Sequence, residues 1–475
     1  MSNERQVYLL DPSQLPPETI AVTFAKTSRS PQSFKEIAAE LTEEKSSQFH
    51  EKWVVNYGHS SVAEHAVLHI AVENISRLAV EALESNRLAS YTEKSSRYQT
   101  WGPLDFHIPQ ELKDHPLKEI YTQTCQKLFE AYHQALDVLP PAAKSMFPQQ
   151  PDETQAAWDR RLRTNMVDVA RYLLPAASLA NVGVTINARA LEHALRKMMT
   201  SPLQEVRQIA EEMKDAALKE VPTLVKYIES LPHLQKAYQM LPAFCPPQST
   251  YNGQEQDWLR LVDWDPSAEE RILAAALYRF SGVSYTQAQD TIIKLSPAQK
   301  SEITDLLLGN LRRHDIPLRE LEFTNFTFDL VLDQGAYFEL KRHRMMSQTP
   351  QSLTTHLGYA VPRMVTLAGF EQPFCEAMHT AQQAYERLAD VSPCLAAYVV
   401  PNAFNRRVLI HTNLRSAYHL INLRTAENAH FAIRRAAQRI AEELRSHLPL
   451  FAQSLNPNPA ESWQSLQEQF FTRVR

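Results

Sequence analysis

Glycine is scarce in this chain, which has nine glycines among 475 residues, against the roughly 7% that is usual. None of them stands in a GxGxxG or GxxxxGK[ST] pattern, the arrangements with which glycine-rich loops surround phosphates. The sequence therefore argues against a dinucleotide site of the Rossmann kind and a nucleotide site of the P-loop kind. If the protein binds a phosphorylated ligand, arginine side chains must hold it.

Cysteine is scarce too, with four residues and no CxxC pair, so neither a disulfide scaffold nor a thiolate zinc site is indicated and no metal is predicted. No apolar run is long enough to cross a bilayer, and the first residues lack the basic-then-apolar pattern of a signal peptide. We therefore expect a cytoplasmic protein without a membrane partner.

An excess of positive charge is also absent, since the net charge is −5. Proteins that coat nucleic acid are usually basic, so no nucleic-acid partner is predicted, although a local basic pocket remains possible. The length suggests roughly two or three domains, and 44% hydrophobic residues are enough for buried cores.

The chain contains an internal repeat between residues 169–198 and 396–424. Aligning Pro175 with Pro401 brings three further pairs into register without a gap: Asn187 with Asn413, Arg189 with Arg415, and His193 with His419. Helical spacing predominates in both segments, because the arginine and the histidine of each copy are four residues apart and share one helix face.

Proline, serine and glycine interrupt the helical patterns at 241–258, the best candidate for a linker. This divides the chain into a first domain, 1–240, and a second, 259–475, which we call the first and second copies. Residues 65–76 and 321–333 alternate in polarity and are rich in β-branched or aromatic side chains, as strands are. The expected fold class is α+β and helix-rich.

The triplet Arg342, His343 and Arg344 is followed after seven residues by Ser352. A basic triplet on its own is most often a solvated helix face. Here, however, the spacing resembles the signature of the flavin-dependent thymidylate synthases, which methylate dUMP with methylenetetrahydrofolate and FAD. Further stretches resemble the same family in the right order: NYGHSSVAEH (56–65), ENISRLA (73–79), NRLASYTEKSSRY (86–98), and the NxR of TINAR and TNLR.

The two copies depart from the family pattern in complementary ways. In the first copy Ser85 and Asn86 replace the opening Arg-His, whereas the downstream part of the motif is intact. In the second copy the opening triplet is intact, but Pro350, Thr354 and Thr355 replace downstream residues. Likewise the family's phosphate-contacting arginine is Arg171 against Ala397, and its late dUMP-contacting arginine is Arg424 against Met198. Each copy has kept what the other has lost.

Family members build each nucleotide site across subunit interfaces, so the resemblance implies two tandem thymidylate synthase-like domains that form a pseudo-dimer with composite sites. Two chains would then pair into a homodimer with the symmetry of a pseudo-tetramer. For dUMP the resemblance implies these residues: Glu93, Ser95, Ser96, Arg97, Arg171, Arg342 and Arg424. Guanidinium groups suit a phosphate dianion, and Arg342 and Arg424 are the expected catalytic residues, because cations near the uracil stabilise developing negative charge. Ser95 and Ser352 have no recognisable base partner and are not expected to act as nucleophiles.

For FAD the resemblance implies contacts from both copies: His59, Ser61, Glu64, Asn187 and Arg189 of the first, and His343, Arg344, Asn413, Arg415 and His419 of the second. Methylenetetrahydrofolate and NADPH are the implied co-substrates. The second copy has no counterpart of His59, which predicts two flavin sites rather than four in the assembly.

Glu339 stands three residues before Arg342, where the family usually has glutamine, and Ala82 occupies that place in the first copy. An added carboxylate leaves the identity of the pyrimidine open. Two alternatives to a thymidylate synthase therefore stand: a re-purposed or inactive paralogue that binds flavin and a pyrimidine nucleotide, and a nucleic-acid-binding module, against which the acidic net charge counts.

Overall fold

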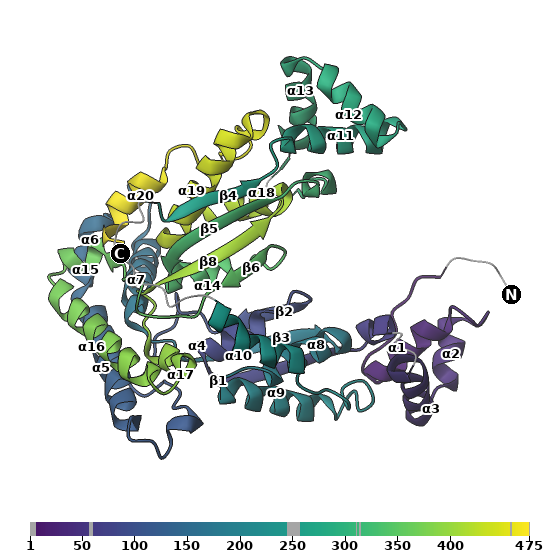
Figure 1. Ribbon diagram of the computed structural model, residues 1–475, viewed down its shortest axis with the longest axis horizontal. Helices are drawn as coiled ribbons and strands as arrows, with labels where there is room; N and C mark the ends of the chain where they lie inside the picture. The colour runs from purple at the N-terminus through teal and green to yellow at the C-terminus, as the bar shows by residue number, and fades with distance from the viewer. Residues whose placement is uncertain are drawn as a thin grey trace. The chain divides into compact units, whose positions relative to one another are not determined.

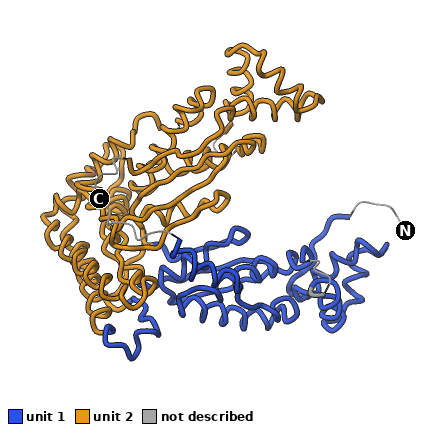
Figure 2. Tube along the Cα trace, viewed as in Figure 1, with its two compact units in different colours: residues 1–95, 105–118, 177–248 blue, residues 96–104, 119–176, 249–475 orange. Residues whose placement is uncertain are grey.

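The computed structural model describes residues 6–56, 60–244, 257–309, 311–312, 315–456 and 458–474. These residues form two compact units (Figure 2). Unit 1 comprises residues 1–95, 105–118 and 177–248, and unit 2 comprises residues 96–104, 119–176 and 249–475. Each unit is built of helices with small antiparallel sheets, which confirms the predicted α+β, helix-rich class.

Unit 1 contains a three-stranded antiparallel sheet in the order β1 (Val67–Ser76), β3 (Leu179–Asn187) and β2 (Ala89–Glu93) (Figure 1). Alternate residues of β3 are buried, as a strand with one covered face requires. Its helices are α1 (Pro17–Lys26), α2 (Phe34–Glu40), α3 (Glu43–Phe49), α4 (Arg77–Glu84), α8 (Ala188–Met199), α9 (Gln204–Ala217) and α10 (Pro232–Met240). Of these, α4, α8 and α9 pack on the strands and enclose the core of the unit.

Unit 2 contains a four-stranded antiparallel sheet in the order β4 (Leu259–Trp264), β5 (Phe326–Asp333), β8 (Asn405–Thr412) and β6 (Ser347–Pro350). A smaller sheet pairs β7 (Val361–Pro362) with β9 (Phe471–Arg473). Phe326, Phe328 and Ile410 are buried against the helices of the unit, and α19 (Phe431–His447) packs on β4 and β5 (Figure 1).

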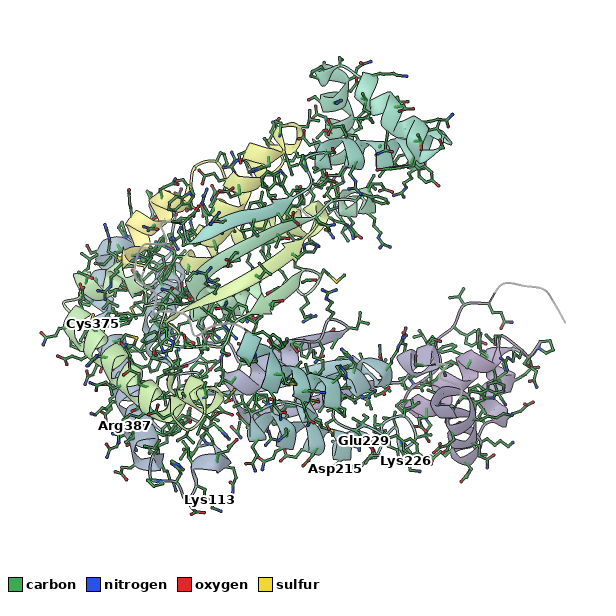
Figure 3. All side chains as sticks on the ribbon, viewed as in Figure 1. Lys113, Asp215, Lys226, Glu229, Cys375 and Arg387 are labelled. Carbon is green, nitrogen blue, oxygen red and sulfur yellow. The ribbon has the colours of Figure 1, made fainter. Side chains whose placement is uncertain are left out.

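The other helices of unit 2 either extend from this sheet or pack beside it. They are α5 (Lys118–Val138), α6 (Pro140–Met146), α7 (Gln155–Ala170), α11 (Ala268–Ser281), α12 (Tyr285–Lys294), α13 (Pro297–Thr304), α14 (Gln334–Leu340), α15 (Arg363–Leu367), α16 (Glu371–Ala389), α17 (Pro393–Ala396), α18 (Leu414–Arg424) and α20 (Trp463–Phe470). Cys375 and Arg387, both labelled in Figure 3, lie on α16. No helix among the described residues is long and apolar enough to cross a membrane.

The strand order β5-β8-β6 of the second copy repeats the order β1-β3-β2 of the first. In both copies a capped helix follows the first strand, with Ser76 capping α4 and Asp333 capping α14. The first copy has one additional residue before this cap, and β1 accommodates it as a bulge in which Asn74 has a φ of 56°. The two copies therefore share one local topology.

The segments 179–187 and 405–412 were wrongly expected to continue a helical pattern, because they are the strands β3 and β8. Each runs directly into a helix, α8 or α18, on which the predicted arginine and histidine pairs lie four residues apart. In both copies an asparagine at the junction caps the helix. Asn187 accepts from the amide of Ala190, and Asn413 accepts from that of Ser416, each at 2.9 Å. The sequence interpretation missed the change from strand periodicity to helix periodicity at this cap.

Pro175 and Pro401, aligned by sequence, lie side by side in an antiparallel bridge of unit 2. Around them the amide of Ala176 donates to the carbonyl of Val400 at 3.0 Å, and that of Asn402 to the carbonyl of Leu174 at 3.1 Å. Equivalent segments of the two copies thus pair with each other inside one unit.

As a result, residues 96–104 and 119–176 belong to the same compact unit as the second copy. The predicted boundaries 1–240 and 259–475 therefore describe the duplication in the sequence. The compact units differ from them, because two segments of the first copy lie in the unit that contains the second copy. Most of the predicted linker, 241–258, lies outside the described residues, and its boundaries stay a prediction.

Candidate anion-binding site

Arg97 of the first copy lies in unit 2 and forms hydrogen bonds with a buried carboxylate. Its Nε donates to both oxygens of Asp168 at 2.9 and 3.1 Å, and its Nη2 donates to Oδ2 at 2.8 Å. Its Nη1 donates to the carbonyl of Asn428, in the second copy, at 3.1 Å. Burial lowers the pKa of Arg97, but the hydrogen bonds and the charge of Asp168 outweigh burial and raise this pKa. The guanidinium is therefore permanently charged and held in a fixed orientation.

Arg171 follows α7 and is 1% exposed. Its Nη1 donates to the hydroxyl of Ser96 at 3.1 Å, and its Nη2 donates to the carbonyl of Gly335 at 3.3 Å. A Cβ at position 335 would lie 3.8 Å from Nη2 of Arg171 and 3.1 Å from a carboxylate oxygen of Asp333. Glycine at this position lets the first turn of α14 come close to the arginine. Arg171 thus joins the two copies within unit 2.

The predicted Arg-His-Arg motif forms the turn between α14 and β6, so it is not a solvated helix face. Nε2 of Gln348 donates to the carbonyls of Leu340 and His343, at 3.1 and 2.9 Å, and fixes this turn. Within it Arg342 is exposed and His343 is buried. The motif therefore presents one cation to solvent and turns the imidazole inward.

Arg424, at the end of α18, bridges the turn and α14. Its Nη1 donates to Oε2 of Glu339 at 2.8 Å, and its Nε donates to Nε2 of His343 at 2.9 Å. Burial, followed by the charges of Arg424 and His419, lowers the pKa of His343 to about 3. The imidazole is therefore neutral and accepts at Nε2, which leaves its proton on Nδ1. The exposed ring of His419 lies 5.6 Å from that of His343.

Glu339 is 4% exposed and lies in the field of four arginines from both copies. Burial raises the pKa of this carboxyl, but the charges of Arg342, Arg171, Arg424 and Arg97 together outweigh burial and lower it. The four guanidinium groups thus lie close enough for their charges to act on this buried carboxylate, and Arg424 contacts it directly. A cluster of cations is the arrangement expected of a site for an anion.

Buried neutral and aromatic groups lie near this cluster. His430 is buried, and its pKa lies well below the usual value because of burial and then the charges of Arg171 and Arg97. Its ring stacks on Tyr172 with centroids 5.9 Å apart. Burial likewise raises the pKa of Asp333, which caps α14, to about 6. The arginines are therefore positioned by elements that add little positive charge of their own.

Two predicted nucleotide residues lie in unit 1. Glu93, at the end of β2, forms an ion pair with Arg77 at 2.6 Å, and both side chains are buried. Ser95 is the last residue of the first segment of unit 1. The structure therefore brings together Ser96, Arg97, Arg171, Arg342 and Arg424 in unit 2, and nucleotide contacts by all seven predicted residues stay predictions.

The predicted flavin residues of the first copy lie in unit 1. Ser61 and Glu64 belong to the 3-10 turn Ser60–His65, and Glu64 accepts from Arg189 on α8. Both side chains of this pair are nearly half exposed. Asn187 caps the same helix. His59 lies outside the described residues.

The second copy repeats this ion pair although it lacks the histidine. Arg415 donates to Oε1 of Glu322 at 2.6 Å and to the carbonyl of Pro317 at 2.9 Å. Asn413 caps α18, so its side-chain oxygen already accepts a bond. These contacts give Asn413 and Arg415 structural roles. Arg344 lies half-buried in the turn with Arg342.

Sequence reasoning missed three residues of the cluster. Asp168 and Asn428 accept hydrogen bonds from Arg97, and the charges of Arg171 and Arg97 lower the pKa of His430. Asp168 precedes Arg171 by three residues on a helical segment, and that spacing could have indicated a shared face. Asn428 contributes its carbonyl, which carries no side-chain signal. No cluster of three or more His, Cys, Asp or Glu suited to a metal ion occurs in the part of the chain that the structure describes.

Fold and cluster together define a duplicated α+β protein in which arginines of both copies lie in one unit. The model of the thymidylate synthase complementing protein family matches the chain twice, over residues 9–223 and 260–450. The chain belongs to this family, as a tandem member.

Similar proteins fall into full-length and half-length groups. A UPF0159 protein from Chlamydia muridarum is 32% identical over 433 residues, which cover 87% of this chain and 81% of the relative. A flavin-dependent thymidylate synthase from Clostridium tetani is 30% identical over 213 residues, which cover 44% of this chain and 82% of that protein. The crystal structure of the flavin-dependent thymidylate synthase from Helicobacter pylori, complexed with FAD and dUMP, matches with a TM-score of 0.31 and 20% identity, over 45% of this chain and 96% of that one.

Proposed function

We propose that this protein is a flavin-dependent thymidylate synthase that converts dUMP to dTMP with methylenetetrahydrofolate, FAD and NADPH. The observation that carries the proposal is the arginine cluster of unit 2, where the charges of Arg97 and Arg171 of the first copy and of Arg342 and Arg424 of the second all act on the carboxylate of Glu339. Because each copy alone contributes only half of these cations, the complementary losses in the sequence leave one complete set.

In this proposal Arg97 and the hydroxyl of Ser96 bind the phosphate of dUMP. Arg171 is wholly buried and orients Ser96 through its 3.1 Å bond, so direct contact between Arg171 and phosphate stays a prediction. Arg424 and Arg342 face the uracil, where their charges stabilise the enolate-like negative charge that develops when the ring is attacked at C6, the carbon next to C5. The neutral His343 holds Arg424 in place.

The donor set on the exposed side of the turn fits FAD. Arg342 and His419 are exposed, and His419 lies next to His343 of the same turn as Arg342. Guanidinium and imidazole groups suit a ligand with both a pyrophosphate and a planar ring system. Arg342, Arg344 and His419 are the residues that would hold it. Bound FAD would supply the reducing equivalents that convert the transferred carbon into a methyl group. We expect a cytoplasmic homodimer, with the second chain completing the flavin sites.

One observation favours a second candidate, the re-purposed paralogue. Glu339 places a carboxylate in the site where the family usually has an amide, and such a charge alters the set of anions that bind. A nucleic-acid-binding module finds no support in the acidic net charge of −5.

The test is to purify the full chain, record its absorption spectrum, identify any released flavin, and measure tritium release from dUMP labelled at C5 with methylenetetrahydrofolate and NADPH. A yellow protein that releases FAD and forms dTMP is the expected result. A flavoprotein that binds dUMP without turnover would favour the paralogue, and a protein that binds neither FAD nor dUMP would contradict both candidates.

A further inference from the structure

The carboxylate of Glu339 and the guanidinium of Arg424 occur together in the second copy and are both absent from the first. Because α14 repeats α4 and α18 repeats α8, Glu339 corresponds to Ala82, and Arg424 corresponds to Met198. Met198 belongs to the hydrophobic core of unit 1, and Ala82 packs against that core. The carboxylate is thus present only in the copy that has kept the arginine, which indicates that the two residues serve the same site.

The cluster carries charges of both signs. The guanidiniums of Arg97, Arg171, Arg342 and Arg424 act on the buried carboxylate of Glu339, and Asp168 pairs with Arg97. Asp333, on which the charge of Arg171 acts, has a pKa of about 6 and is ionised at pH 8, while His343 and His430 are neutral because burial and the arginines lower the pKa of each. Replacing Glu339 with glutamine removes one negative charge from this cluster and raises its net charge by one.

Excess charge of either sign is costly in a site that is largely removed from water. Each further phosphate group of a diphosphate or triphosphate adds negative charge, which the carboxylate of Glu339 repels. Glu339 has only acceptor atoms when ionised, so it cannot bond to an additional phosphate group.

We propose that Glu339 is a specificity-determining residue that limits the negative charge the arginine cluster accepts, and so selects a monophosphate over a diphosphate or triphosphate. For nucleotides this inference rests on the proposed function, whereas for simple phosphates it rests on the cluster alone. The repulsion from one fixed charge grows in proportion to the charge of the ligand. Removing it must therefore favour polyphosphates more than monophosphates.

The experiment compares the full chain with Glu339→Gln, which keeps the size of the side chain and an acceptor for Arg424, and with Glu339→Asp, which keeps the charge. Asp329→Asn is the matched control, because Asp329 lies in the same unit, also pairs with an arginine, Arg407, at 2.8 Å, and loses the same charge on substitution. Affinities for inorganic phosphate, pyrophosphate, dUMP and dUTP are measured by calorimetry at pH 8 and low salt, with circular dichroism as the check of folding.

We expect Glu339→Gln to bind phosphate and dUMP about tenfold more tightly than the unmodified chain, and pyrophosphate and dUTP by a still larger factor, with the gain reduced by salt. Glu339→Asp and Asp329→Asn should stay within about twofold of the unmodified chain. Equal gains for phosphate and pyrophosphate, or no gain, would overturn the proposal, as would a failure of every variant to bind any of the four ligands.

If the simple phosphates behave as expected but no variant binds dUMP, the role of Glu339 stands and the proposed function fails. The unmodified chain provides a test that does not depend on the folding of a variant. It must bind dUMP at least tenfold more tightly than dUTP, and a chain that prefers dUTP would contradict the selection.

Discussion

The two copies place different polar side chains at equivalent positions. We call the place where α14 meets α18 the second corner, and its counterpart between α4 and α8 in the first copy the first corner. In the first copy Nζ of Lys197 donates to the side-chain oxygens of Ser85 and Asn86, each at 3.1 Å, and burial lowers the pKa of this lysine. In the second copy Arg424 bridges Glu339 and His343. The first corner satisfies its own polar groups, whereas the second gathers four cations around one carboxylate.

This difference shows how one of two duplicated sites can be lost without loss of the fold. Ser85 and Asn86 are short enough to be satisfied by one neighbouring lysine, and Met198 continues the hydrophobic core. Burial of Lys197 carries a desolvation cost, which its lowered pKa reflects, and its two hydrogen bonds offset part of that cost. The sheet order and the helix caps are unchanged, because they depend on other positions.

The largest effect is expected for Arg424→Met, which replaces Arg424 with the residue found at the equivalent position of the first copy, Met198. We expect turnover of dUMP to fall at least about 100-fold, because the cation that faces the uracil is removed. Stability should fall by about 3 kcal/mol, since Glu339 is left buried without its nearest partner. The double variant Arg424→Met, Glu339→Ala should recover most of the stability and none of the turnover.

These two quantities are measured by labelled-substrate turnover and by urea unfolding. If the double variant regained activity together with stability, Arg424 would act only through the fold and the contrast between the two corners would have no functional meaning.

Arg97→Ala removes a cation that the first copy contributes to unit 2. We expect dUMP to bind about 1.5–3 kcal/mol more weakly, the range for hydrogen bonds to a charged group, while flavin content stays near normal. The matched control is Arg161→Ala, because Arg161 lies on α7 and forms a similar two-pronged pair with Glu153, at 2.8 and 2.6 Å.

Calorimetric titration with dUMP separates the two variants. Equal affinity in Arg97→Ala and the unmodified chain would remove the first copy from the nucleotide site, whereas weaker binding in both variants would indicate a general effect on unit 2.

His343→Asn replaces the buried imidazole with the residue of the first copy. The pKa of His343 is about 3 in the folded protein and ordinary, near 6.5, in the unfolded chain. Below pH 6.5 the unfolded chain therefore binds a proton that the folded protein does not, so this residue makes stability fall as the pH decreases, by up to about 1.4 kcal/mol per pH unit. The asparagine variant should lose this contribution between pH 6.5 and 4.

Urea unfolding at a series of pH values gives the slope for both proteins. Parallel slopes would show that His343 is protonated in the folded protein, which would contradict its role as an acceptor for Arg424.

The smallest effects are expected for the two ion pairs that recur in the two copies, Glu64 with Arg189 and Glu322 with Arg415. Glu64→Gln should change stability by less than about 0.5 kcal/mol, because Glu64 and Arg189 are nearly half exposed and screened by water. Glu322→Gln should cost slightly more, up to about 1 kcal/mol, since Glu322 and Arg415 are less exposed.

Flavin content is measured beside urea unfolding for these two variants. If Glu64→Gln loses flavin at unchanged stability, Glu64 contacts the cofactor as predicted. If it retains flavin, the pair serves to hold the 3-10 turn against α8.

The cations of the cluster could be predicted because the motifs that contain them resemble those of a known family. Arg342, His343, Arg424 and Arg97 are among the residues that this resemblance implied, and the complementary losses led to the hypothesis that both copies contribute to one site. The structure places these residues in one unit. The strands β3 and β8 were missed because each is joined to a helix without a break, and the helical spacing after Asn187 and Asn413 dominated the reading of both segments.

Other features could not be read from the sequence for physical reasons. Nothing local indicates that Asp168 neutralises Arg97, because its charge matters only once the chain has folded. The contribution of Asn428 is a backbone carbonyl, which any residue could supply. The exchange of residues 119–176 into the unit of the second copy depends on hydrogen bonds between segments more than 200 residues apart.

The bridge between Pro175 and Pro401 has a consequence for inheritance. In an assembly of identical chains, a residue on a symmetry axis meets its own duplicate, so every mutation there appears on both sides at once. Here the two sides are separate codons, and Arg171 has been able to persist while its counterpart is Ala397. One chain therefore carries two different copies in a fixed one-to-one ratio, and a mutation can change one side of the bridge without changing the other.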